Sequence, residues 1–119
     1  MYLNGNVTLM VKDFPGSVNF YAEKLGLPLK VRYGDDWAEF QAPGITVALH
    51  PARGEAIPHD GATSIGLEVA DIAATYALLK SRGVEFASPP VDAGHAILAN
   101  FTDPEGNGFY LMQMPSAPR

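Results

Sequence analysis

The sequence contains no cysteine. That absence excludes disulfide bonds, thiolate nucleophiles and cysteine-based metal sites, and it favours a cytoplasmic location. Long apolar runs are missing as well: none approaches the roughly 20 residues that a membrane-spanning helix needs. The first residues also lack a basic stretch followed by an apolar one, so we expect neither a secretory signal nor a membrane partner.

Basic residues are scarce. The chain has 8 Lys and Arg against 13 Asp and Glu, and its formal net charge is −5. Non-specific binding to nucleic acid depends on Lys and Arg that neutralise phosphates, so we expect no nucleic-acid partner. The acidic balance is compatible with a cationic ligand. A length of 119 residues, of which 47% are hydrophobic, suits one globular domain, which we expect to span residues 1–119.

The chain contains an internal repeat. Residues 7–14 and 65–72 share one pattern, in which an alternating apolar run is followed by an Asp and then by an apolar residue that opens a helix. Each helical stretch ends at a glycine, Gly26 in the first half and Gly83 in the second, as helices commonly do. A duplicated chain builds two similar half-sheets. We expect a pocket between the two halves to be a place for a ligand.

Periodicity predicts the same order of elements in both halves. We expect a first module at residues 5–50, a linker rich in Pro and Gly at 51–62, a second module at 63–114 and a tail at 115–119. In the first module the predicted elements are a strand at 6–12, a helix at 14–25 and strands at 27–33, 37–41 and 45–50. In the second they are a strand at 64–70, a helix from 72 to 83 and strands at 84–88, 95–101 and 107–113.

Alternation along each strand separates two faces of each sheet. One face is apolar and must be covered by the helix of its module. The other mixes polar, aromatic and small side chains, a composition typical of the lining of a small-molecule cavity, although two open sheets could also present it to solvent. The candidate ligand-binding residues on this face are Asn6, Trp37, Glu39, Ala48, His50, Ser64, Glu68, Asn100, Tyr110 and Met112.

Three segments resemble the vicinal-oxygen-chelate superfamily, which includes glyoxalase I, extradiol dioxygenases, fosfomycin-resistance enzymes and bleomycin-binding proteins. They are residues 11–21, the Leu25-Gly26-Leu27 sequence and the turn at 103–107 that leads to Leu111. The resemblance implies an α+β fold of tandem βαβββ modules that form an open, cavity-lined sheet. It does not imply one reaction, because the scaffold hosts lyases, epimerases, dioxygenases, transferases and non-catalytic binders.

Metal-dependent members of the superfamily carry His, Glu or Gln at four positions on the cavity face. The resemblance maps these positions onto Asn6, Ala48, Ser64 and Tyr110. A catalytic divalent site needs about three good nitrogen or oxygen ligands, which these residues do not supply. We therefore expect no metal ligand at these positions and no cofactor.

His50 and Glu39 are the candidate catalytic residues. They are predicted to share a face on neighbouring strands, where they could form an acid–base pair or a shifted metal site. Alternatively, His50 is a rim histidine that bonds solvent or a backbone carbonyl. Glu68 is either a base or a solvated carboxylate. Trp37, the only Trp, either stacks on a planar or cationic ligand or packs under a loop or against a second subunit.

Three functions follow from these residues. The first is a binder of a small, planar or cationic organic molecule, similar to the bleomycin-binding class. The second is a metal-dependent glyoxalase I-like lyase or isomerase, or a dioxygenase, in which His50, Glu39 or Glu68 hold a divalent metal. The third is an accessory domain that interacts mainly with protein. The resemblance also implies a homodimer, since open half-sheets leave edges that a second copy could cover.

Overall fold

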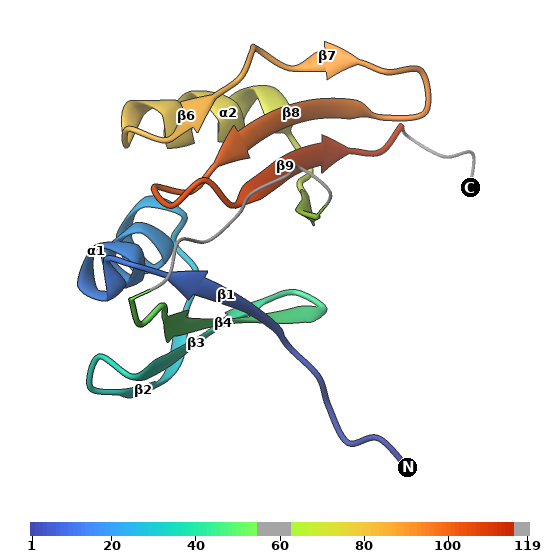
Figure 1. Ribbon diagram of the computed structural model, residues 1–119. Coiled ribbons are helices and arrows are strands. Elements are labelled where there is room, and N and C mark those ends of the chain that lie inside the picture. The colour runs from blue at the N-terminus through green and yellow to red at the C-terminus, as the bar shows by residue number, and fades with distance from the viewer. Residues whose placement is uncertain (55–62, 116–119) are drawn as a thin grey trace. The chain divides into compact units, whose positions relative to one another are not determined.

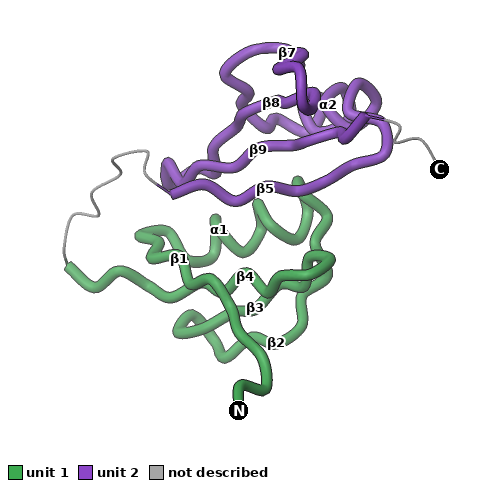
Figure 2. Tube along the Cα trace, turned by 90° about the vertical axis from the view of Figure 1, so that its right-hand side faces the viewer, with its two compact units in different colours: residues 1–58 green, residues 59–119 purple. Residues whose placement is uncertain are grey.

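The computed structural model describes residues 1–54 and 63–115. The chain divides into two compact units, residues 1–58 and 59–119, which are shown in different colours in Figure 2. Part of the predicted linker and most of the predicted tail, residues 55–62 and 116–119, lie outside the described residues.

Unit 1 is a four-stranded sheet with one helical segment (Figure 1). The strand order is β1-β4-β3-β2, in which β1 is parallel to β4 and the other pairs are antiparallel. The register of β2 against β3 shifts between Leu29 and Val31. The elements are β1 (Val7–Val11), α1 (Phe14–Asn19), the π-helical turn η1 (Phe20–Lys24), β2 (Leu29–Tyr33), β3 (Trp37–Ala42) and β4 (Ile45–Pro51).

The helical segment of unit 1 starts as predicted but ends differently. The Asp13 carboxylate caps it by accepting a hydrogen bond from the Gly16 N–H at 3.0 Å. The prediction of one continuous α-helix to residue 25 is wrong, because α1 ends at Asn19 and a π-helical turn follows. In that turn the Leu25 N–H donates to the Phe20 carbonyl at 3.0 Å. The wider turn accompanies the burial of two adjacent aromatic residues, Phe20 and Tyr21.

The core of unit 1 lies between this helical segment and one face of the sheet. Tyr21 packs on Phe40 with 5.6 Å between ring centroids. Phe40 is paired with Val47, and Val47 with Val7, so the apolar side chains of three strands share the covered face. Between residues 38 and 49, most strand residues on this face in β3 and β4 are buried, and only Ile45 at the start of β4 is half-buried. The buried residues are Ala38, Phe40, Ala42, Val47 and Leu49.

Unit 2 repeats this plan with one more strand. Its sheet has the order β5-β9-β8-β6, in which β5 is parallel to β9. The additional strand, β7, pairs with β8 on the same edge as β6. A chain of aromatic contacts connects the helix to the sheet. The distances between ring centroids are 4.7 Å from Tyr76 to Phe86, 5.2 Å from Phe86 to Phe101 and 5.3 Å from Phe101 to Phe109. The elements are β5 (Ser64–Glu68), α2 (Ile72–Ser81), β6 (Glu85–Phe86), β7 (Val91–Asp92), β8 (Ile97–Thr102) and β9 (Gly108–Gln113).

The predicted strand at residues 84–88 is wrong in extent. Only Glu85–Phe86 form β6, and a second short strand, β7, pairs further along the same edge of β8. The sequence Pro89-Pro90 separates the two, and proline has no N–H to donate to a sheet. The strand predicted from His95 likewise begins later, at Ile97.

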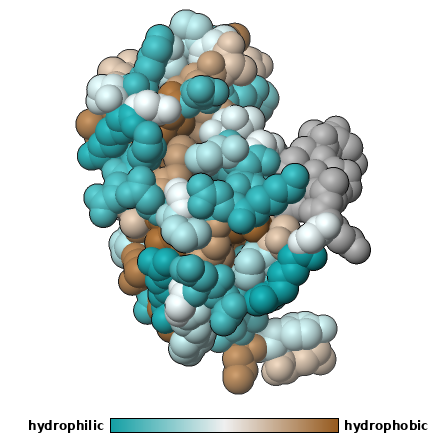
Figure 3. Space-filling view, turned by 60° about the vertical axis from the view of Figure 1, so that its left-hand side comes forward, coloured by the Kyte–Doolittle hydropathy of each residue, from teal (hydrophilic) through white to brown (hydrophobic). Residues whose placement is uncertain are grey.

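The α+β fold with two βαβββ-like modules is confirmed. Within the described part of the chain, no helix is long and apolar enough to cross a membrane. One side of the molecule is shown by hydropathy in Figure 3, where hydrophilic side chains are interspersed with apolar ones.

Candidate ligand-binding face

The predicted faces are confirmed by the register of the strands. In unit 1, Thr8, Ala48 and Glu39 are paired side by side across β1, β4 and β3. In unit 2, Gly66, Tyr110 and Asn100 are paired in the same way across β5, β9 and β8. Both rows lie on the face that does not pack against the helix of the same unit, which we call the helix-free face. Residues at repeat-related positions therefore occupy equivalent places in the two sheets.

Beside the row of Thr8, Ala48 and Glu39, the helix-free face of unit 1 has a second row that consists of three aromatic rings and one methionine. Met10 is paired with His50, and Tyr33 with Trp37. Trp37 and His50 lie edge to face, with 6.4 Å between ring centroids and 75° between ring planes. Met10 is 40% exposed and Tyr33 is 64% exposed, whereas the two central rings are half-buried. Met10, His50, Trp37 and Tyr33 form a continuous row across all four strands, here called the aromatic band.

Glu39 holds the indole of Trp37 in place. The Trp37 Nε1–H donates a hydrogen bond to Oε2 of Glu39 at 2.8 Å. The other carboxylate oxygen lies 4.0 Å from the Lys30 ammonium. Trp37 therefore has a defined orientation on the sheet, and Glu39 has partners other than His50. Among the hydrogen bonds and ion pairs of the described residues, none joins Glu39 to His50, although both lie on the predicted face.

His50 has a defined tautomer. Its Nδ1 lies 2.8 Å from the carbonyl oxygen of Pro51. Because a carbonyl oxygen only accepts, Nδ1 must carry the hydrogen of this bond. In the neutral ring Nε2 then has the free lone pair and can accept a hydrogen bond or bind a metal.

The four positions that hold a metal in metal-dependent members carry poor metal ligands in this chain. Asn6 lies just before β1, and its Oδ1 accepts a hydrogen bond from the Thr8 hydroxyl at 2.9 Å. Ala48 has no donor atom and is fully buried, Ser64 is the exposed first residue of β5, and Tyr110 is half-buried in β9. Residues 1–54 and 63–115 contain no group of three or more His, Asp or Glu side chains that could hold a metal ion. This donor set does not fit a divalent ion.

The ring of Tyr110 in β9 lies over Gly66 of the neighbouring strand β5. A side chain at Gly66 would overlap the Tyr110 ring and hydroxyl, so the ring occupies the space that any larger residue at position 66 would fill. Its row ends with the exposed Asn100. The next row pairs the exposed Glu68 with the half-buried Met112. Among the described residues of unit 2, the helix-free face therefore offers a phenol, an amide and a carboxylate, but only one ring.

Tyr33 belongs to the aromatic band but was not among the candidate residues predicted from the sequence. It ends the predicted strand at 27–33, which we assigned to no face. A signal was present, because the short turn at residues 34–36 pairs Tyr33 with Trp37 directly across the hairpin. Aromatic residues on both sides of such a turn share one face of the sheet.

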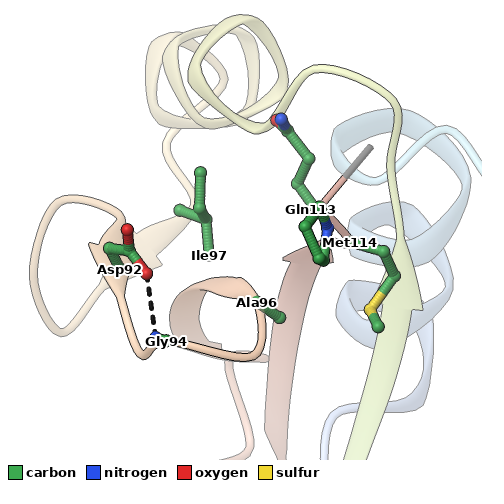
Figure 4. A pocket seen from close by; sticks show the side chains of 7 residues that line it. Asp92, Gly94, Ala96, Ile97, Gln113 and Met114 are labelled. Atoms are coloured by element: carbon green, nitrogen blue, oxygen red, sulfur yellow. Dashed lines mark hydrogen bonds between the residues drawn. The ribbon is translucent and has the colours of Figure 1, made fainter. Parts of the chain in front are cut away.

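Unit 2 also has a small pocket beside Ile97, where β8 begins (Figure 4). Its volume is about 140 Å³. The Asp92 carboxylate beside it accepts a hydrogen bond from the Gly94 N–H at 2.8 Å, and Gln113 accepts one from the Ile72 N–H at 2.8 Å. Both groups therefore support the local backbone. The lining residues are Asp92, Gly94, Ala96, Ile97, Gln113, Met114 and Pro115.

Comparison with known proteins identifies the family. A model of the Glyoxalase/Bleomycin resistance protein/Dioxygenase superfamily matches residues 5–111. A protein of Mycolicibacterium smegmatis is 31% identical over 102 residues, which cover 86% of this chain and 85% of the relative. The protein YurT of Bacillus subtilis is 32% identical over 120 residues, which cover 89% of this chain and 94% of the relative.

Solved structures agree with this match. The structure of a glyoxalase/bleomycin resistance protein/dioxygenase from Nocardioides has a TM-score of 0.77 and 28% identity, and the match covers 96% of this chain and 84% of that one. A superfamily member from Sphaerobacter thermophilus has a TM-score of 0.78 and 26% identity, with coverage of 95% and 98%. The resemblance found in the sequence is confirmed. The chain belongs to the Glyoxalase/Bleomycin resistance protein/Dioxygenase superfamily.

Proposed function

We propose that this protein binds a small organic molecule on the aromatic band and does so without a metal, as bleomycin-resistance-type binders do. The observation that carries the proposal is the orientation of Trp37 between Glu39 and His50. A ring that is already held in place loses little conformational entropy when a ligand stacks on it. The band is therefore a prepared surface for a planar group.

The chemistry of the band favours a planar cation. An indole face attracts positive charge, and here the indole edge donates to a carboxylate. The net charge of −5 adds a weak general attraction for cations. The Nε2 of His50 supplies one hydrogen-bond acceptor for a ligand N–H or O–H group.

Fluorescence of the only Trp tests the proposal directly, because all indole emission comes from Trp37. The purified protein is titrated with proflavine, a planar cation, and with anilinonaphthalene sulfonate, an anionic dye. We expect saturable quenching by proflavine with tighter binding than the anionic dye shows. Absence of saturable quenching by proflavine, or tighter binding of the anionic dye, would contradict the proposed ligand class.

Variants locate the binding by calorimetry, which does not depend on the indole. Trp37→Leu removes the central ring, and we expect about a tenfold loss of proflavine affinity, the scale of one aromatic stacking contact. The matched control is Tyr2→Ala, since Tyr2 is 90% exposed and precedes the first strand. An equal loss in both variants would place the binding elsewhere.

A metal-dependent lyase, isomerase or dioxygenase is the second candidate. It is favoured by one observation, the tautomer of His50 that leaves Nε2 free for a metal. Elemental analysis of protein purified without chelator separates the two functions. Near-stoichiometric Ni, Zn, Mn or Fe that is lost in His50→Ala would favour the enzyme and overturn the metal-free binder.

The proposed binder is also a cytoplasmic homodimer. The absence of cysteine supports the location, and the outer strands β1 and β2 of the first sheet support the assembly, since each has an edge without a partner strand in its own sheet. Sedimentation of the purified protein should give the mass of a dimer. A monomer at micromolar concentration would remove the assembly from the proposal.

A further inference from the structure

We propose that Asn4 is a site of spontaneous deamidation and that Asn107 is protected from the same reaction. The sequence has two Asn–Gly pairs, Asn4-Gly5 and Asn107-Gly108. Asn–Gly is the dipeptide in which the following amide nitrogen attacks the side-chain carbonyl most readily, because glycine has no side chain to hinder it. The two pairs have the same local chemistry and different surroundings.

Asn4 is free to reach the reactive geometry. It is exposed and lies before β1, outside any helix or strand. A Cβ added to Gly5 would meet nothing within 4 Å, so the peptide between the two residues is surrounded by open space. No hydrogen bond described for the residues of this segment restrains the Asn4 side chain or the Gly5 amide. Free rotation of both groups is what ring closure requires.

The register of β1 against β4 leaves Asn4 without a neighbouring strand. Val7 is paired with Val47, and β4 begins only at Ile45, directly after the turn at Pro43-Gly44. In this register Asn4 would lie opposite Gly44, so a longer β1 could pair no further than Gly5 and would still leave Asn4 outside the sheet. The exposure of Asn4 is thus a consequence of the sheet register.

Hydrogen bonds restrain both the side chain and the backbone of Asn107. Its Nδ2 donates to Oδ2 of Asp103 at 2.8 Å, and its N–H donates to Oδ1 at 2.7 Å. Its carbonyl accepts from the Asp103 N–H at 3.0 Å. Gly108 is the first residue of β9 and is paired with both Ser64 and Thr102. The Asn107 amide group and the Gly108 nitrogen cannot approach each other without breaking these contacts.

The reaction needs only water and a base. The Gly5 nitrogen forms a bond to Cγ of Asn4, its proton passes to hydroxide or buffer base, and the bond from Cγ to Nδ2 breaks to release ammonia. Water then opens the succinimide at either carbonyl and leaves aspartate or isoaspartate at position 4. Each product adds one negative charge to a chain whose net charge is −5. Isoaspartate also adds one backbone carbon just before the sheet.

Peptide mapping of the intact, folded protein tests this inference. The protein is held in mildly alkaline buffer at body temperature, digested, and analysed by mass spectrometry, with isoaspartate detected by an isoaspartate methyltransferase. We expect Asp and isoAsp forms of the peptide that contains Asn4, at least tenfold faster than any change at Asn107. Comparable rates at both positions, or an unchanged Asn4 while an Asn–Gly peptide standard converts, would overturn the inference.

Two variants test separately the role of Gly5 at the reactive pair and the role of the Asp103 hydrogen bonds at the protected pair. Gly5→Ala occupies open space and keeps the fold, and we expect it to slow the change at Asn4 severalfold or more. Asp103→Ala removes the acceptor of both Asn107 donors, and we expect Asn107 to become reactive. Circular dichroism confirms that the variant is folded. If Asp103→Ala fails to fold, Gly5→Ala still decides the inference, because an unchanged rate at Asn4 would contradict it.

Discussion

The two units have the same strand register but differ in the side chains that they place on it. In unit 1 the row across the sheet centre is Thr8, Ala48 and Glu39, and in unit 2 it is Gly66, Tyr110 and Asn100. The two units therefore share one backbone plan, while their helix-free faces carry different side chains. Unit 1 carries the aromatic band, and the equivalent row of unit 2, Glu68, Met112 and Leu98, has no ring. Function has to be assigned to each unit by its own side chains.

The largest effect is expected in the two cores. Phe40 of unit 1 and Phe109 of unit 2 are 0% and 1% exposed. Phe40→Ala and Phe109→Ala should each lower the free energy of unfolding by about 3–5 kcal/mol, because each removes a buried ring and leaves a cavity. Urea unfolding followed by circular dichroism measures both. A loss below about 1 kcal/mol in either variant would mean that its unit is not held by this core.

A smaller effect tests the divergence between the two central rows. Gly66→Thr gives unit 2 the residue that unit 1 has at the equivalent place, and it should cost about 1–3 kcal/mol because the Tyr110 ring must move. Gly66→Thr combined with Tyr110→Ala reproduces the Thr8 and Ala48 pair. The double variant should be more stable than the Gly66→Thr variant if the two residues compensate each other, and thermal unfolding measures this coupling. Additive losses would show that they do not.

The smallest effect is expected where the two units agree. Asp13 caps α1 by accepting from the Gly16 N–H at 3.0 Å, and Asp71 caps α2 by accepting from the Ala74 N–H at 3.1 Å. Asp13→Ala and Asp71→Ala should each cost about 1 kcal/mol, measured as a lowered urea midpoint. The matched pair Asp13→Asn and Asp71→Asn keeps a capping oxygen and should recover most of that loss. No recovery would mean that the carboxylates act otherwise than as caps.

The repeat made much of the fold predictable. Alternation in β1 and β5 and the caps at Asp13 and Asp71 identify the same module twice, and the glycines Gly26 and Gly83, at φ 73° and 91°, end the helical segments. The π-helical turn was not predictable, because the spacing of apolar residues in a short segment does not distinguish its last turn from an α-helical one. The division of one strand into β6 and β7 depends on pairing along β8, which local sequence does not contain.

The candidate site was predictable in its face and less so in its partners. Strand alternation placed Trp37, Glu39 and His50 on one side, as the register confirms. Alternation did not reveal that the Glu39 carboxylate accepts a hydrogen bond from Trp37 on its own strand and not from His50 on the neighbouring strand. Both partners lie at similar distances from Glu39 on this face. Side-chain rotamers, which periodicity does not specify, decide which contact forms.

Parallel pairing of the first and last strands has a consequence for synthesis on the ribosome. In unit 1 the earliest strand, β1, pairs only with the latest one, β4, through contacts as distant in sequence as Val7 with Val47. The nascent chain can form the β2–β3 hairpin early, but it can complete the sheet only after residues up to Pro51 have left the exit tunnel. The sheet of the first module therefore waits for its own last strand, and, among the strands that the structure describes, its pairing involves none of the second module.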